Sequence, residues 1–96
     1  MQIPIDGQQI HSCDDFFQQC AAALGPGVTW HHDLDGLHEL LLTGLPQAAT
    51  LVWSAAEISR RALGDEQYLA LIDVLENAVC VQHRFGWAGA FTYQLA

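Results

Sequence analysis

The sequence predicts an α/β fold in which a small three-stranded parallel β-sheet packs against helices, in the order β-α-α-β-α-α-β. Three observations support this prediction. Short apolar runs occur near the start, in the middle and at the end of the chain. Two segments with helical spacing and helix-start residues separate each run from the next. Strands joined by helical crossovers lie parallel in a sheet.

The first half of the chain is expected to contain one strand and two helices. The strand "MQIPI" ends at an Asp6-Gly7 turn. Ser12 is placed to cap a helix over about 13–24, because acidic residues follow it in the first turn, and "GPG" ends that helix. Asp33 can cap a second helix over about 34–42, which Gly44 can terminate.

The second half repeats the pattern. The run "ATLVWS", 49–54, reads as a buried strand. Ser54 and Glu57 form a capping-box pattern for a helix that ends near Gly64. Asp65 is expected to cap a longer helix to about 79. The segment "QHRFGWAG" is expected to be a loop, and "AFTYQLA" the final strand.

Four further side chains receive structural interpretations. Trp53 is expected in the core, and Trp87 over the sheet edge. We interpret Cys80 as a core cysteine and His83 as a loop histidine, because no third group is available to make them a catalytic pair.

Composition indicates a single globular domain, residues 1–96. Hydrophobic residues make up 51% of the 96 positions and charged residues 15%, which excludes a disordered chain. There are 11 acids, three arginines and no lysine, for a net charge of −8. Such a charge repels nucleic acids and anionic membranes and attracts basic proteins.

The cysteines and the start of the chain predict a cytoplasmic protein. Cys13 and Cys20 are expected about 10 Å apart along a helix axis, too far for a disulfide. The number of cysteines is odd, so we expect reduced thiols. The start has neither a basic leader nor an apolar run, and no apolar segment approaches the ~20 residues of a membrane span.

The second predicted helix has a split character. Leu34, Leu37 and Leu41 are expected on one side, and Asp35, Gly36 and Glu39 on the other. The two carboxylates are four residues apart, with no lysine or arginine nearby, so they repel each other. Two interpretations remain open: a solvated face of an acidic protein, or a patch that offers anionic oxygens to a cationic pocket in another protein. Gly36 is expected to leave room beside the acids.

The order of several motifs resembles the barstar family of small intracellular inhibitors of secreted ribonucleases. The resemblance rests on "IDGQQIHSCDDF", "HDLDGLHELLLTG", a buried strand with Trp53, and a long late helix. It covers about residues 3–79, with a looser match in the closing strand. It implies a barstar-like fold and a partner that is a basic ribonuclease or a related toxin.

The resemblance also implies a binding site. Members of the family plug the RNA-binding cleft of the ribonuclease with an acidic helix and the loop before it. Asp35 and Glu39 match the carboxylates that occupy phosphate positions there, and Thr43 and Gly44 match the following loop one residue late, because this chain has an extra Leu. Glu76 is the nearest acid of the late helix, although the match could slip onto Asn77. The implied partner-binding residues are Asp35, Glu39, Thr29, Trp30, Asp33, His38, Thr43, Gly44 and Glu76.

Departures from the family pattern keep other functions open. His31, His32, His38 and Leu45 replace the family's residues at contact positions, and contact surfaces decide partner choice. One alternative is therefore a barstar-fold interaction or immunity module with a partner that is not a ribonuclease. A less favoured one is a metal site built on the histidines, although no H-E-x-x-H or C-x-x-C motif is present. We expect no catalytic residues, no cofactor and no functional metal.

Overall fold

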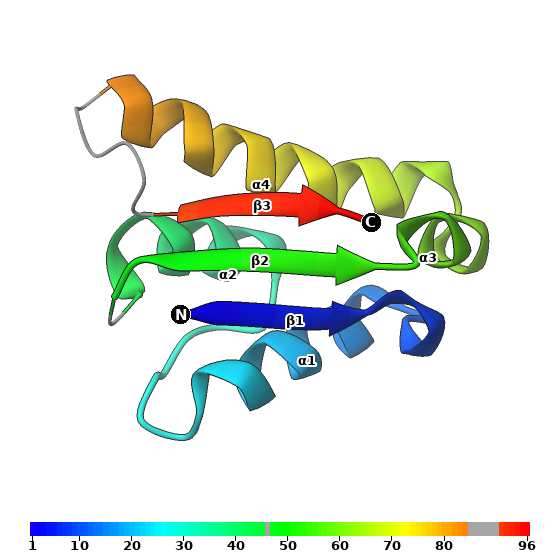
Figure 1. Cartoon of the computed structure of the whole chain (residues 1–96), viewed down its shortest axis with the longest axis horizontal. Coiled ribbons are helices and arrows are strands. Elements are labelled where there is room, and N and C mark those ends of the chain that lie inside the picture. The colour runs from blue at the N-terminus through cyan, green and yellow to red at the C-terminus, as the bar shows by residue number, and fades with distance from the viewer. Residues whose placement is uncertain (46, 85–90) are drawn as a thin grey trace.

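The computed structural model describes residues 1–45, 47–84 and 91–96. These residues form one parallel sheet of three strands, in the order β1-β2-β3 (Figure 1). The strands are β1 (Gln2–Asp6), β2 (Ala49–Ser54) and β3 (Phe91–Leu95). The predicted fold class and order of elements are therefore confirmed, with β2 at the predicted bounds.

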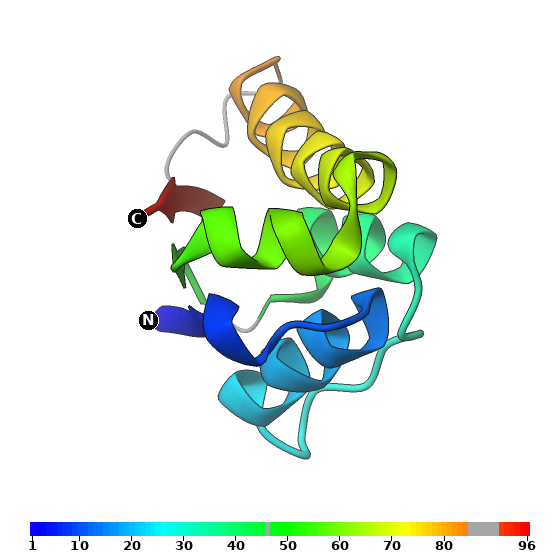
Figure 2. The same ribbon diagram turned by 90° about the vertical axis from the view of Figure 1, so that its right-hand side faces the viewer.

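The sheet has one covered face and one open face. Figure 2 shows the helices on one side of the sheet. Ile3 and Ile5 of β1, and Leu51 and Trp53 of β2, are at most 1% exposed and point toward the helices. The residue between the two isoleucines, Pro4, faces solvent. This alternation follows from the two-residue period of a strand, and it places the core between sheet and helices.

The first helix, α1 (Cys13–Leu24), follows a single 3-10 turn, η1 (Gly7–Gln9). Its bounds are those predicted. The Ser12 hydroxyl accepts a hydrogen bond from the Asp15 backbone N–H at 3.3 Å, so Ser12 is the N-cap. The helix ends at Gly25, whose φ of 86° most side chains avoid.

The site helix, α2 (Leu34–Glu39), continues directly into a π turn, η2 (Leu40–Gly44). Asp33 caps it as predicted. The helical segment is longer than the predicted 34–42, because the π turn continues it through Gly44.

The third helix, α3 (Ala56–Leu63), does not begin as predicted. Ser54 still belongs to β2, and its hydroxyl donates to the Ile5 carbonyl of β1 at 3.1 Å. The residue before the helix is Ala55, in the left-handed conformation with φ 51° and without a side-chain cap. The predicted capping box at Ser54 is therefore wrong, because the strand extends to this residue and directs its side chain across the sheet. The end at Gly64 is confirmed.

The last helix, α4 (Asp65–Arg84), is longer than predicted. It begins at Asp65 itself, so Asp65 is the first helical residue and not the predicted cap. The Asp65 carboxylate instead accepts from Arg60 Nε at 2.8 Å. The helix continues past residue 79 to Arg84. Its last turn includes Gln82, which is buried. His83 therefore lies in the helix and not in a loop. Trp87 lies outside the described residues.

Aromatic rings join the sheet to the helices. Trp53 is fully buried, as predicted, with its ring centroid 4.8 Å from that of Phe16 and 5.5 Å from that of Tyr68. Its indole N–H donates to the buried Ser59 hydroxyl at 2.9 Å, and Ser59 donates to the Gly7 carbonyl at 2.8 Å. Strand β2, helix α3 and the η1 turn are thus tied by hydrogen bonds as well as by packing.

The three cysteines are free, in agreement with the prediction for Cys13 and Cys20. Burial raises the pKa of Cys20 to about 12, which keeps it a neutral core thiol. Cys80 is exposed, so its interpretation as a core cysteine is wrong. None of the described helices is long and apolar enough to cross a membrane.

Candidate functional site

The acidic face of α2 points to solvent. Leu37 and Leu41 are 0% and 2% exposed and anchor the helix to the core, whereas Asp35 and Glu39 are exposed. Among the described residues, ion pairs join Arg60 to Asp65 and Arg61 to Glu57, and none reaches either α2 carboxylate. The outward orientation of these two acids agrees with the sequence prediction.

Asp33 caps the start of α2 with its side chain. Its carboxylate accepts a hydrogen bond from the Gly36 N–H at 2.6 Å, which satisfies one of the free donors of the helix N-terminus. One of its oxygens, Oδ1, is therefore engaged in the helix cap.

Gly36 has a different role from the predicted one. It is buried, and a Cβ built on it would lie 2.0 Å from the His31 carbonyl oxygen. The room that the missing Gly36 side chain leaves is thus taken up by the His31 carbonyl of the preceding loop. The placement of Gly36 on the solvent side was wrong, because the loop before α2 folds back against the helix. An interior helix glycine usually costs about 1 kcal/mol relative to Ala, and here it permits this close approach.

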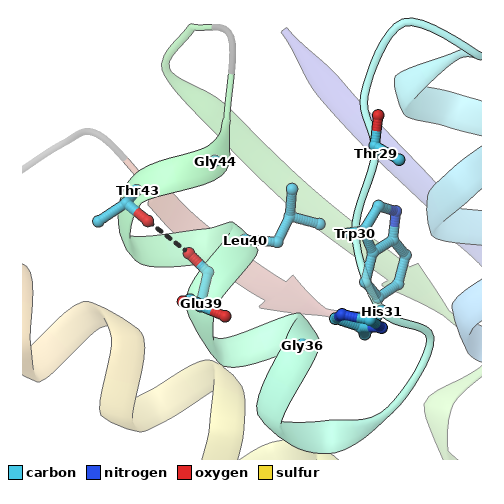
Figure 3. A pocket seen from close by; sticks show the side chains of 8 residues that line it. All are labelled: Thr29, Trp30, His31, Gly36, Glu39, Leu40, Thr43 and Gly44. Carbon is cyan, nitrogen blue, oxygen red and sulfur yellow. Dashed lines mark hydrogen bonds between the residues drawn. The ribbon is translucent and has the colours of Figure 1, made fainter.

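The loop and helix enclose a cavity of about 340 Å³ (Figure 3). Trp30 and His31 come from the loop and face the helix across it. Five of the predicted site residues line this cavity together with residues that the sequence analysis did not assign to binding. The lining residues are Thr29, Trp30, His31, Gly36, Glu39, Leu40, Thr43 and Gly44.

The π turn forms the far wall of this cavity. The Thr43 hydroxyl donates to the Glu39 carbonyl at 3.1 Å, four residues back, so Thr43 returns to the face that carries Glu39. A π turn holds one residue more than an α-helical turn. Within this turn, Thr43 and Gly44 both line the cavity.

Trp30 is held from two sides. Its ring meets Phe17 edge-on at a centroid distance of 6.0 Å and lies 4.5 Å from the His32 ring. Among the described residues, the buried Trp30 indole nitrogen has no hydrogen-bond partner. The aromatic wall is thus fixed by packing.

A second, more open hollow of about 770 Å³ lies beside the start of α2. Asp35 lines this one, so the two carboxylates of α2 serve different hollows. The first turn of α1 and the start of α4 complete it, which sequence spacing on α2 alone could not reveal. The lining residues are Ser12, Cys13, Asp14, Phe17, His32, Asp33, Leu34, Asp35 and Gln67. Burial raises the pKa of the Cys13 thiol, so it stays neutral.

The helix α4 presents Asn77, not Glu76, to the site helix. The His38 imidazole Nε2 lies 2.7 Å from Asn77 Oδ1. Glu76 instead accepts a hydrogen bond from the Tyr93 hydroxyl of β3, and this bond raises the pKa of Tyr93 to about 12. Successive residues of a helix point in directions that differ by about 100°. Asn77 therefore faces α2 while Glu76, one residue earlier, faces β3.

The histidines near α2 do not come together as a metal site. Among the residues that the structure describes, no group of three or more His, Cys, Asp or Glu side chains is arranged to hold a metal ion. His32 packs on Trp30, and His38 contacts Asn77.

Comparison with known proteins places the chain in a family. No curated protein matches it. The sequence model of the family described as "Barstar (barnase inhibitor)" matches residues 1–86, which is most of the chain. The matched residues include β1, β2 and all four α-helices of the structure. The chain belongs to the barstar family.

Proposed function

We propose that this protein inhibits a basic ribonuclease, or a related toxin, by inserting the acidic face of α2 into the active cleft. The observation that carries the proposal is that the Asp35 and Glu39 carboxylates are exposed and without a neutralising cation among the described residues. Both lie on a rigidly anchored helix. Their mutual repulsion of a few tenths of a kcal/mol is relieved when a partner supplies positive charge.

Electrostatics supports a cationic partner. The chain carries a net charge of −8. Ribonucleases bind the phosphates of RNA with basic side chains, so carboxylates at the same positions substitute for the substrate. Long-range attraction accelerates association, and added salt slows it.

The cavity beside Glu39 gives the interface shape. Trp30 supplies an aromatic wall, Leu40 an apolar floor and Thr43 a polar rim. A partner side chain that enters it meets the Glu39 carboxylate at the cavity wall. We assign Thr29, Asp33, His38 and Gly44 to the surrounding contact surface, and we replace Glu76 with Asn77, which faces α2.

An assay of barnase inhibition tests the proposal, because the family is described as a barnase inhibitor family. The variants Asp35→Asn and Glu39→Gln keep side-chain size and remove charge. Each should weaken inhibition by at least about 30-fold, since loss of one buried charge pair costs about 2 kcal/mol or more. Glu57→Gln on α3 removes the same charge elsewhere and should change inhibition by less than about threefold. Equal inhibition by all three variants would refute the helix assignment.

A second candidate keeps the surface and changes the target. His31 lines the cavity and His38 is engaged with Asn77, so the contact surface carries imidazoles at family contact positions. Partner capture from the native host separates the two candidates. A basic nuclease retained by the parent protein and lost by Glu39→Gln supports inhibition, whereas retention of another protein with the same dependence on Glu39 supports an interaction module.

We place this action in the cytoplasm. The three thiols are free, which suits a reducing compartment. Fractionation of the native host would test this, and recovery of the protein outside the cytoplasm would contradict it.

A further inference from the structure

Two ionisable side chains lie on facing walls of the cavity beside α2. His31 belongs to the loop before the helix, and Glu39 is the last residue of α2 (Figure 3). Among the described residues that line the cavity, these are the two with ionisable side chains. A partner group that enters the cavity therefore meets an imidazole on one side and a carboxylate on the other.

The backbone of His31 is held in place by α2 and by its own loop. Its carbonyl lies directly against Gly36, where any side chain would collide with it. The Asp33 N–H also donates to this carbonyl at 2.9 Å. The preceding residue, Trp30, packs edge-on against Phe17 of α1. The imidazole is thus carried by a well-packed segment and stays beside the cavity.

The two ionisable groups are not joined to each other. Among the described residues, ion pairs form within α3 and between α3 and the start of α4, and none involves His31 or Glu39. Both side chains are exposed. The cavity between them is therefore free to receive a side chain of the partner, which would contact both.

The other charged groups around His31 do not line this cavity. The π turn η2 has no ionisable side chain. α4 meets α2 through Asn77 and His38, on a face outside the cavity. Glu39 is thus the charged group that faces His31. The remaining charged or ionisable residues of the loop, α1 and α2 line the second hollow, namely His32, Asp14, Asp33 and Asp35.

We propose that His31 makes the binding of a cationic partner side chain at Glu39 depend on pH. This dependence rests on the proposed function, since it concerns the partner group that enters the same cavity. A neutral imidazole accepts a hydrogen bond from an ammonium or guanidinium group, whereas a protonated imidazole repels it. Histidines ordinarily change charge between about pH 5 and pH 8. The protein should therefore bind a basic partner at neutral pH and release it as pH falls.

The expected effect is that of one proton. Two like unit charges about 4 Å apart in water change a binding constant about fivefold. We therefore expect His31 to lower the affinity for a cationic partner at least about fivefold between about pH 8 and about pH 5.5. Added salt should reduce this effect, because it screens the repulsion.

Calorimetric titration with barnase at about pH 8 and about pH 5.5 tests the proposal. The quantity compared is the pH ratio, which is the affinity at the higher pH divided by that at the lower pH. Titrating groups of barnase contribute equally to every pH ratio. Circular dichroism sets the lower pH, as the lowest value at which every protein compared is folded.

Three variants separate the role of His31 from other effects. His31→Gln removes the titrating group and should lower the pH ratio of the parent at least about fivefold. His31→Lys keeps a positive charge throughout and should bind at least about fivefold more weakly than His31→Gln at the higher pH. His11→Gln is the matched control, because His11 is exposed and lines neither the cavity nor the second hollow, and it should keep the parent's pH ratio.

The outcomes distinguish this inference from ribonuclease inhibition. If the parent binds barnase and His31→Gln has the same pH ratio, the inference is wrong and the proposed function stands. Equal affinity of His31→Lys and His31→Gln at the higher pH, or an equal drop in the pH ratio for His31→Gln and His11→Gln, would also overturn it. Absence of barnase binding by the parent at both pH values would refute the proposed function, and the role of His31 with it.

Discussion

Replacement of Gln82 by leucine tests how the site helix is held in place. Gln82 is 1% exposed on α4. Its amide Nε2 donates to the Leu41 carbonyl in the π turn at 3.1 Å, and its Oε1 accepts from the Phe91 N–H of β3 at 2.8 Å. One side chain thus joins the site, the long helix and the sheet. Gln82→Leu keeps the volume and removes both bonds.

The expected loss of stability follows from the two groups left unpaired. A buried donor or acceptor without a partner costs about 1–3 kcal/mol, so two cost about 2–6 kcal/mol. The leucine recovers about 1–2 kcal/mol through its apolar surface. The net loss is about 3 kcal/mol, which lowers the melting temperature by about 12–24 °C in a domain of this size.

Urea and thermal unfolding of Gln82→Leu measure this loss directly. Gln94→Leu is the control, because it changes an exposed glutamine on β3 and should alter the unfolding free energy by less than about 0.5 kcal/mol. If Gln82→Leu loses less than about 1 kcal/mol, the described bridge does not hold the π turn, and the account of the site's rigidity fails.

Three further substitutions probe the same structure. Gly36→Ala should lower the unfolding free energy by about 1–3 kcal/mol and alter Trp30 fluorescence, because the new Cβ meets the His31 carbonyl at 2.0 Å; a gain in stability would contradict this. Ser12→Ala should cost about 1 kcal/mol by chemical unfolding, through loss of the α1 cap. The pKa of Tyr93 is raised from 10.0 to about 12 by its bond to Glu76, so its contribution is complete below pH 10 and lost as pH rises through about 12. Unfolding across this range should show a smaller loss in Tyr93→Phe, and an unchanged alkaline loss would refute the bond.

Much of the fold could be predicted because local signals and burial agree. The strands alternate or run apolar, and Ser12 and Asp33 cap their helices as expected. The parallel order follows from the helical crossovers, which leave no other simple arrangement of the strands. The outward orientation of Asp35 and Glu39 followed from the 100° step of the helix.

The errors arose where tertiary contacts override local patterns. Ser54 has the spacing of a cap, but its strand pairing with β1 directs the hydroxyl to Ile5. Gln82 was predicted to begin the loop before the last strand, yet two backbone groups satisfy its amide within the core. Cys80 lies on the exposed side of a helix that was predicted to end earlier.

The site itself was only partly predictable. Spacing on one helix indicated the two acids, but not that each lines a separate hollow. The role of Gly36 depends on a loop contact that helical periodicity does not encode. The placement of Asn77 against His38, with Glu76 turned to Tyr93, depends on the rotation of α4 in the packed structure.

The most direct test of the central claim is calorimetric titration of barnase with the double variant Asp35→Asn/Glu39→Gln. The account predicts an affinity at least about 10³-fold below that of the parent protein, since two buried charge pairs are lost. The variant should still unfold within about 0.5 kcal/mol of the parent, because neither carboxylate has a described internal partner. A parent protein that binds barnase no more tightly than this variant would contradict the claim.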